Sequence, residues 1–403
     1  MISKIVNNMK QENRTPAYVF DLDILSKRVQ WIQSVLEKER IGLCYAMKAN
    51  PFLISALKSL ADRLEVCSPG EFRICEREQI PMERIVVSGV NKEQKDLKRI
   101  VETYQGQGIF TIESKEQLYL LNDCAMLVDK KLQVLIRLTS GNQFGVDLDV
   151  AKQMIAKRRE YPWIDIKGIQ YYSGTQKKKL AAIEKELYVL KEFTEEIQTQ
   201  LGYTLEEIEY GPGLYVPYFQ KEESCEEELL QGLCKIIHNM QLKEKITLEM
   251  GRFVAADCGS YYTTIVDKKE NAGQVYGIVD GGIHQLNYYG QTMAMKVPNV
   301  VHYSCETDDL ETLKRIDATE EKWNICGSLC TTADVIVKQL PLKGAQIGDV
   351  LEFQRTGAYS MTEGISLFLS RDLPQILFYS KEQGLQLIRN TSSTDVWNSK
   401  SVN

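Results

Sequence analysis

The chain has 403 residues, of which 43% are hydrophobic and 26% are charged, and its formal net charge is −6. These values are ordinary for a globular protein, and the length favours two domains over one core. The charge balance gives no basic stripe for nucleic acid or an anionic membrane, and no apolar run reaches membrane-spanning length.

Cysteine and histidine usage narrows the chemistry further. The ten cysteines are scattered without CxxC pairs, and the three histidines show no HExxH spacing. We therefore expect no metal, and thiols that stay reduced as small buried side chains. The N-terminus lacks the apolar core of a signal peptide, so a cytoplasmic protein is expected.

The first two thirds of the chain alternate strand-like and helix-like segments. A strand at Tyr18–Asp21 and an amphipathic helix at Leu22–Lys38 come first. The expected strands that follow are Gly42–Met47, Leu64–Cys67, Ile85–Ser88, Ile109–Ile112, Gln133–Leu138, Ile166–Tyr172, Glu207–Tyr210 and Ile246–Glu249. The expected helices between them are Pro51–Leu60, Lys92–Thr103, Ser114–Leu121, Leu148–Lys157, Lys177–Leu201 and Glu222–Gln241. Eight such units predict a (β/α)8 barrel of the TIM type, while a doubly wound sheet is the alternative, although no GxGxxG follows an early strand.

The pattern changes after about Ala256 to short strands separated only by turns. The expected strands are Ser260–Val266, Gln274–Val279, Trp323–Cys326, Val335–Pro341, Asp349–Phe353 and Gln375–Phe378, which predict an antiparallel β domain. The first strand is expected to join this domain. The predicted limits are 23–258 for the barrel, 1–22 with 259–390 for the β domain, and 391–403 for a polar tail that frays.

One lysine stands out in the apolar run Ile41–Asn50. Lys48 closes a strand that is expected to be buried on both faces, and lysine is rarely buried. Desolvation would lower its pKa and make it a nucleophile able to form a Schiff base. The alternative is a lysine whose ammonium group reaches solvent from the strand end.

Other polar residues follow the ends of the expected barrel strands, where barrel enzymes place their chemistry. Gly211-Pro-Gly213 would expose backbone N–H groups to a phosphate, and Arg252 could grip the same phosphate. Glu249 could pair with a protonated ring nitrogen. With a Schiff-base lysine, these groups describe a pyridoxal-phosphate pocket. Taken singly, each has another explanation: a tight turn, a surface ion pair of Glu249 with Arg252, a barrel aromatic at Tyr172 and a helix N-cap at Ser68.

Several motifs together resemble a known family. YAMKAN, EVCSPGEF, VSGVNK, EMGR, CGSLCTTAD and GAY are similar to motifs of the fold-type III pyridoxal-phosphate decarboxylases, which include diaminopimelate, ornithine and arginine decarboxylases. The resemblance covers residues from Thr15 to about Leu387. It implies an alanine-racemase-like barrel, a C-terminal β domain and α-decarboxylation of an amino acid.

The resemblance also implies roles for individual residues. Lys48 would form the internal aldimine, Glu249 would face the pyridine nitrogen, and Cys330 would reprotonate Cα of the quinonoid. Cys330 and Asp334 would reach the active site of the partner subunit in a homodimer. The residues implied to bind the cofactor are Lys48, Ser68, Arg137, Tyr172, Thr175, Gly211, Gly213, Glu249, Gly251, Arg252 and Tyr359, and those implied to bind substrate are His284, Thr331 and Asp334.

Departures from the family pattern bear on the substrate. Tyr172 stands where the family usually has a histidine stacked on the cofactor, and Pro212 has no N–H for a phosphate. Asp280–Asn287 lacks the arginine that holds a distal carboxylate, and Thr331 replaces the glutamate that recognises a distal amino group. These losses argue against free diaminopimelate.

YSGTQ, GxYVPYF, VDGGxH and GxLCTxxD are similar instead to motifs of the L-glutamyl carrier-protein decarboxylases of butirosin-type biosynthesis, so the substrate is expected to be an amino acid carried on a protein. Three alternatives remain: a decarboxylase of free diaminopimelate, ornithine or lysine, a non-catalytic relative that binds a partner, and a racemase.

Overall fold

The computed structural model describes residues 14–305 and 319–400 and separates the chain into two compact units. The barrel unit contains Ser26–Val216 and Ser224–Val254, and the sheet unit contains Met1–Leu25, Pro217–Glu223 and Ala255–Asn403. The structure thus groups Pro217–Glu223 with the sheet unit, a short excursion that the sequence-based division at residues 22 and 258 does not contain.

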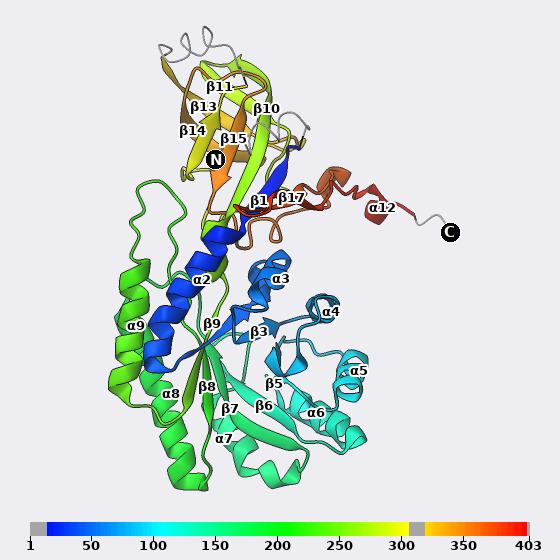
Figure 1. Ribbon diagram of the computed structural model, residues 1–403, viewed down its shortest axis with the longest axis vertical. Helices are drawn as coiled ribbons and strands as arrows, with labels where there is room; N and C mark the ends of the chain where they lie inside the picture. Colours follow the sequence, from blue (N-terminus) through cyan, green and yellow to red (C-terminus); the bar gives the residue numbers. More distant parts are fainter. Residues whose placement is uncertain (1–13, 306–318, 401–403) are drawn as a thin grey trace. The chain divides into compact units, whose positions relative to one another are not determined.

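Eight parallel strands close into the barrel, as predicted (Figure 1). They are β2 (Gly42–Ala46), β3 (Arg63–Val66), β4 (Ile85–Val87), β5 (Ile109–Ile112), β6 (Leu132–Leu138), β7 (Ile164–Tyr172), β8 (Glu207–Gly211) and β9 (Lys245–Met250). Pairing of β9 with β2 completes the ring. Apolar residues fill most positions of these strands because both faces are covered.

Helices surround the barrel strands. They are α2 (Leu22–Leu36), α3 (Ile54–Leu57), α4 (Pro69–Arg77), α5 (Gln94–Tyr104), α6 (Lys115–Val128), α7 (Leu148–Ala156), α8 (Leu180–Leu201), α9 (Glu226–Met240) and α10 (Arg252–Ala255). The helix predicted over residues 51–60 is wrong in extent. A 3-10 turn at Pro51–Leu53 precedes the four-residue α3, and the Asn50 side chain caps that turn by accepting from the Phe52 N–H at 3.1 Å.

The sheet unit is built from nine strands. They are β1 (Ala17–Asp21), β10 (Gly259–Asn271), β11 (Gln274–Val279), β12 (Val300–Tyr303), β13 (Glu320–Cys326), β14 (Val335–Lys343), β15 (Val350–Gln354), β16 (Gln375–Ser380) and β17 (Gly384–Arg389). The first strand joins this sheet, as predicted, between β10 and β16. Most pairs in this sheet are antiparallel, as predicted, but β1 pairs parallel to β16 and β11 parallel to β13, so the sheet is mixed. In neither parallel pair do the strands follow each other directly along the chain, so no tight hairpin fixes their relative direction.

The C-terminal segment is more ordered than its polar composition predicts. Leu373 pairs with Ser392, and the buried Thr394 hydroxyl donates to the Arg371 carbonyl at 2.9 Å. A short helix, α12 (Asp395–Asn398), follows. Regular structure and hydrogen bonds thus extend to Asn398, contrary to the fraying expected for residues 391–403, and residues 401–403 lie outside the described part. Among the described residues, no helix combines the length and apolarity needed to cross a membrane.

Candidate active site

Lys48 lies one turn beyond the end of β2. The chain leaves the strand at Ala46 and enters a 3-10 turn, Met47–Ala49, which the Asn50 N–H closes by donating to the Met47 carbonyl at 3.0 Å. The Lys48 side chain is 41% exposed, but its ammonium group is held by carboxylates. Its Nζ lies 2.6 Å from Glu65 Oε2 and 3.1 Å from Glu249 Oε1. The lysine therefore points to a specific acidic site and does not simply extend into solvent.

The two carboxylates beside Lys48 titrate very differently. Burial works against ionisation of Glu65, but the Lys48 charge and the hydrogen bonds with Glu249 and Lys48 together outweigh it and lower the pKa of Glu65 to about 2. Burial raises the pKa of Glu249 to about 7, and the charge on Glu65 adds to that rise. Two close carboxyl groups avoid sharing two negative charges in this way. Glu249 can thus hold or release a proton near neutral pH.

Glu65 is a residue that the sequence-based interpretation missed. It is 2% exposed and belongs to β3, in the apolar sequence Leu64-Glu-Val66. A buried acidic residue in a barrel strand needs a partner. The lone glutamate in this otherwise apolar stretch was the available signal.

A third buried acid, Glu209, extends the network beyond Glu249. Gln170 of β7 donates through Nε2 to Glu209 Oε1 at 2.7 Å and to Glu249 Oε2 at 3.4 Å. Glu209 of β8 is fully buried. Burial, with the charges of Glu249 and Glu65, raises the pKa of Glu209 to about 8. Glu209 is therefore protonated at neutral pH, and Gln170 links it to the acid beside Lys48.

The raised pKa of Glu209 predicts a pH-dependent cost in stability. The unfolded group releases its proton near its ordinary pKa of 4.5, whereas the folded group retains it until about pH 8. Folding therefore takes up a proton between these values, and stability falls as pH rises across that window. Between these pH values, the free energy of unfolding of Glu209→Gln should rise relative to that of the wild type by about 1.4 kcal/mol per pH unit.

The measurement is urea unfolding of the cofactor-free protein at several pH values from 5 to 8.5. Glu228→Gln, on the exposed surface of α9, is the matched control and should parallel the wild type. A constant difference between Glu209→Gln and wild type at every pH would contradict a protonated Glu209.

Two glycine-containing turns lie beside Tyr172, the last residue of β7. The first turn, residues 173–177, follows β7, and the second, residues 211–213, begins at the last residue of β8. A Cβ at Gly211 would lie 2.7 Å from Cδ2 of Tyr172, and one at Gly213 would lie 1.9 Å from the Gly174 carbonyl oxygen. Gly213 also has a φ of +57°. Burial raises the pKa of Tyr172, while the nearby Lys48 charge and a hydrogen bond with Thr175 act to lower it. The structure thus gathers Tyr172, Thr175, Gly211 and Gly213 on the side of the barrel mouth formed by β7 and β8.

Gly251 and Arg252 follow β9, and Arg252 is the first residue of α10. Arg252 is 8% exposed and the Glu249 side chain is 9% exposed. A surface ion pair between these two residues is therefore excluded. Arg252 instead lies close enough to Tyr172 for its charge to lower the pKa of that phenol.

Two other predicted cofactor-binding residues make structural contacts. Ser68 caps α4 by accepting from the Glu71 N–H at 3.1 Å, so the N-cap alternative holds. Arg137 Nη1 lies 3.2 Å from Glu113 Oε1, and its guanidinium lies 4.7 Å from the centroid of the Phe144 ring. These contacts fix both side chains at the barrel mouth.

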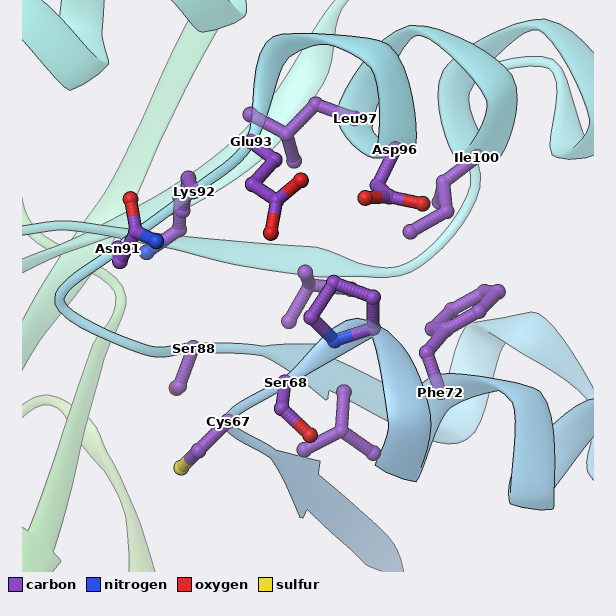
Figure 2. A pocket seen from close by; sticks show the side chains of 13 residues that line it. Cys67, Ser68, Phe72, Ser88, Asn91, Lys92, Glu93, Asp96, Leu97 and Ile100 are labelled. Carbon is purple, nitrogen blue, oxygen red and sulfur yellow. The ribbon is translucent and has the colours of Figure 1, made fainter. Parts of the chain in front are cut away.

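A pocket adjoins Lys48 over the ends of β3 and β4. Figure 2 shows Cys67 and Ser68 on one side and Asn91 and Lys92 across from them. Cys67 lines this pocket and its Sγ is 3.8 Å from Lys48 Nζ, so the pocket lies next to the lysine. Burial lowers the pKa of Lys92 to about 8, and its Nζ donates to the Gly89 carbonyl at 2.7 Å. The family-like motif VSGVNK thus supplies one wall of the pocket.

The remaining predicted residues belong to the sheet unit: His284, Cys330, Thr331, Asp334 and Tyr359. Cys330 is exposed on the loop between β13 and β14. Asp334 is buried, and its oxygens accept from the N–H groups of Ile283 at 2.9 Å and Leu329 at 2.7 Å. Asp334 therefore organises the loop that carries Cys330. Burial, with Arg371 nearby, lowers the pKa of His284 to about 4.

The chain is similar to known proteins over most of its length. The family model described as "Pyridoxal-dependent decarboxylase, pyridoxal binding domain" matches residues 22–256. A diaminopimelate decarboxylase of Aquifex aeolicus is 26% identical, with 88% of this chain and 84% of the relative covered. The L-glutamyl-[BtrI acyl-carrier protein] decarboxylase of Niallia circulans is 25% identical, with 94% and 92% covered. The crystal structure of the diaminopimelate decarboxylase of M. jannaschii has the same fold, with a TM-score of 0.83, 22% identity, and 96% and 92% covered.

Proposed function

Since the chain belongs to the pyridoxal-dependent decarboxylase family, we propose that it decarboxylates an amino acid carried on a carrier protein. The family makes it an amino-acid decarboxylase that uses pyridoxal phosphate. The attachment of the substrate to a carrier protein is supported by the charges and hydrogen bonds in two loops of the sheet unit.

The residues at the barrel mouth fit pyridoxal phosphate. They provide a primary amine at Lys48, a buried carboxyl at Glu249 and a half-buried aromatic face at Tyr172. The backbone at Gly213 approaches Gly174 so closely that no Cβ could be accommodated. Backbone N–H groups of such a turn, with Thr175 and the nearly buried Arg252, form a suitable holder for a phosphate group.

The proposed chemistry divides among a few side chains. When bound, pyridoxal phosphate supplies the electron sink for the charge left at Cα when carbon dioxide departs. Lys48 provides the covalent attachment point, and Glu249 holds a proton on the ring nitrogen. Glu65, whose pKa is lowered to about 2, stays ionised and keeps the Lys48 amine oriented. Cys330, from a second subunit, delivers a proton to Cα.

The single observation that carries the substrate proposal is the lack of a free charge in two loops. In the described segments 280–287 and 327–334, both oxygens of Asp280 accept from threonine groups, and both oxygens of Asp334 accept from backbone N–H groups. His284 has its pKa lowered to about 4 and is neutral at physiological pH. These loops therefore offer no cationic side chain to a distal carboxylate, and both of their carboxyl groups are already engaged by donors, which suits a substrate whose distal end is a neutral thioester or amide.

The test is carbon dioxide release from matched substrates. Free glutamate, lysine and meso-diaminopimelate are compared with glutamate loaded on an acyl-carrier protein, each at the same concentration. We expect kcat/KM for the loaded substrate to exceed that for every free amino acid by at least about 100-fold. Equal or faster turnover of a free amino acid would refute the carrier assignment and leave the decarboxylase assignment intact.

A second candidate, decarboxylation of a free amino acid with a distal carboxylate, is favoured by Arg371. Its Nη2 donates to the Ser328 carbonyl at 2.7 Å, two residues before Cys330, and its side chain is exposed. A guanidinium here could bind a carboxylate. In that case Arg371→Gln should raise the KM for the free substrate by about 10-fold or more with little change in kcat.

A shared active site in a homodimer predicts that two defective variants complement each other. Lys48→Ala and Cys330→Ala place their lesions in different units of the chain. If each site uses Lys48 of one subunit and Cys330 of the other, a heterodimer has one intact site. After mixing and subunit exchange, decarboxylase activity should rise to roughly a quarter of wild type. Activity that stays at the mean of the two parents, with exchange verified by native mass spectrometry, would mean that the site lies within one chain.

A further inference from the structure

The carboxylate of Glu186 holds the turn that follows β7, one of the two glycine-containing turns of the proposed phosphate site, by hydrogen bonds. Glu186 lies in the second turn of α8, and its side chain is 17% exposed. Its Oε1 accepts from the Ser173 hydroxyl at 2.6 Å, and its Oε2 accepts from Lys177 Nζ at 2.7 Å and from the Tyr210 hydroxyl at 2.6 Å. Three donors from two different strand ends thus converge on one side chain.

The positions of these donors make the contact relevant to the site. Ser173 and Lys177 lie two residues before and two residues after Thr175, so Glu186 fixes both ends of the turn that carries Thr175. Tyr210 comes directly before Gly211 on β8 and is fully buried. Burial and the Glu186 charge raise the pKa of Tyr210, which keeps the phenol a proton donor.

Hydrogen bonds attach Gly213 and the residues after it to the first turn. The Lys177 N–H donates to the Gly213 carbonyl at 2.9 Å, and the Tyr215 N–H donates to the Lys177 carbonyl at 3.2 Å. The Gln176 side chain donates to the Val216 carbonyl at 2.9 Å and accepts from the Val216 N–H at 2.8 Å. Any displacement of Lys177 is therefore passed to Gly213.

This rigidity compensates for Pro212. Because proline has no N–H, the turn after β8 has one phosphate donor fewer than an all-glycine turn would have. The remaining donors, on Gly213 and Thr175, must then be accurately placed, since hydrogen bonds weaken steeply with misalignment. A charged acceptor on a long helix is a suitable anchor, because hydrogen bonds to an ionised group are stronger than neutral ones.

We propose that Glu186 is a positioning residue that sets the geometry of the two phosphate-binding turns through Ser173, Lys177 and Tyr210. The inference rests on the proposed function, since it assumes that these turns hold the phosphate of pyridoxal phosphate. It adds a determinant of cofactor affinity that makes no contact with the reacting atoms.

The test compares the affinity of the full chain, freed of cofactor, for pyridoxal phosphate and for pyridoxal, which lacks the phosphate group. In Glu186→Gln, the Kd of pyridoxal phosphate should rise by about 10- to 100-fold, while the Kd of pyridoxal should change by less than about 3-fold. Glu184→Gln, on the exposed face of the same helix, is the matched control and should match wild type for both ligands. Tyr210→Phe retains the ring and removes one hydrogen-bond donor to Glu186, so it should raise the Kd of pyridoxal phosphate by a smaller factor than Glu186→Gln does.

The outcomes separate the inference from its premise. Equal losses of affinity for both ligands in Glu186→Gln and Tyr210→Phe would make Glu186 a merely structural residue and overturn the inference. Unchanged affinity for pyridoxal phosphate in both variants would overturn it as well. If the wild type itself bound pyridoxal as tightly as pyridoxal phosphate, the phosphate site in the proposed function would be the part that fails.

Discussion

Lys48→Ala should leave the purified protein without the visible absorbance of covalently attached pyridoxal phosphate and should lower kcat by about 10³-fold or more. The physical reason lies in the position of the amine. Nζ of Lys48 lies between Glu65 and Glu249 at 2.6 and 3.1 Å, at the mouth of the barrel. No other lysine in the described part of the chain forms an ion pair with Glu65 or Glu249, so Lys48 is the amine expected to carry the cofactor.

The measurement has two parts. Borohydride reduction followed by peptide mass spectrometry should find the cofactor mass on the peptide containing Lys48 in wild type and on no peptide in the variant. Lys58→Ala, an exposed lysine ten residues further on, should keep the absorbance and the activity. A variant that stays yellow, with a borohydride-trapped adduct at another lysine, would remove Lys48 from the proposed chemistry and reopen the reading of the chain as a non-catalytic binding protein.

The barrel could be predicted because its strands are buried on both faces. Each reads as a short apolar run between helical segments, and all eight occur where the pattern indicates. The sheet unit was predictable only in part. The strands β12 and β17 were missed. Neither contains a fully buried residue: Val300–Tyr303 is half-buried throughout, and Gly384–Arg389 is half-buried or exposed at every position. Strand direction depends on long-range pairing, which local sequence does not encode.

The site was predictable where a residue ends or follows a strand, or where a family-like motif marks it, as EMGR marks Glu249 in β9; it was not predicted for the other two acids within strands. Lys48, Tyr172 and Arg252 occupy visible breaks between apolar runs. Glu65 and Glu209 lie inside β3 and β8, where the expectation for each position is an apolar core residue. Their role appears only when closure of the barrel brings Glu65, Glu209 and Glu249 together from three strands far apart in the sequence.

Glu249→Gln is expected to separate cofactor attachment from catalysis. The variant keeps Lys48 and Glu65, so it should bind pyridoxal phosphate covalently and stay yellow. Its kcat should nevertheless fall by about 10²-fold or more, because a neutral amide cannot hold a proton on the ring nitrogen as a carboxylate does. The loss should appear in kcat with KM changed much less, since the interaction matters most as negative charge develops at Cα.

The pKa of Glu249, raised to about 7 by burial and by Glu65, sharpens this expectation. A nearby positive charge stabilises the ionised form of such a carboxyl group. Binding of pyridoxal phosphate with a protonated ring nitrogen should therefore lower the pKa of Glu249 and release a proton near pH 7. Calorimetric binding of pyridoxal phosphate in two buffers of different ionisation enthalpy measures that proton, and Glu249→Gln should abolish its release. Glu192→Gln, on the exposed surface of α8, should retain both proton release and kcat. Full activity of Glu249→Gln at pH 7 would mean that the ring nitrogen works unprotonated, and that Glu249 serves only to balance the charge of Lys48.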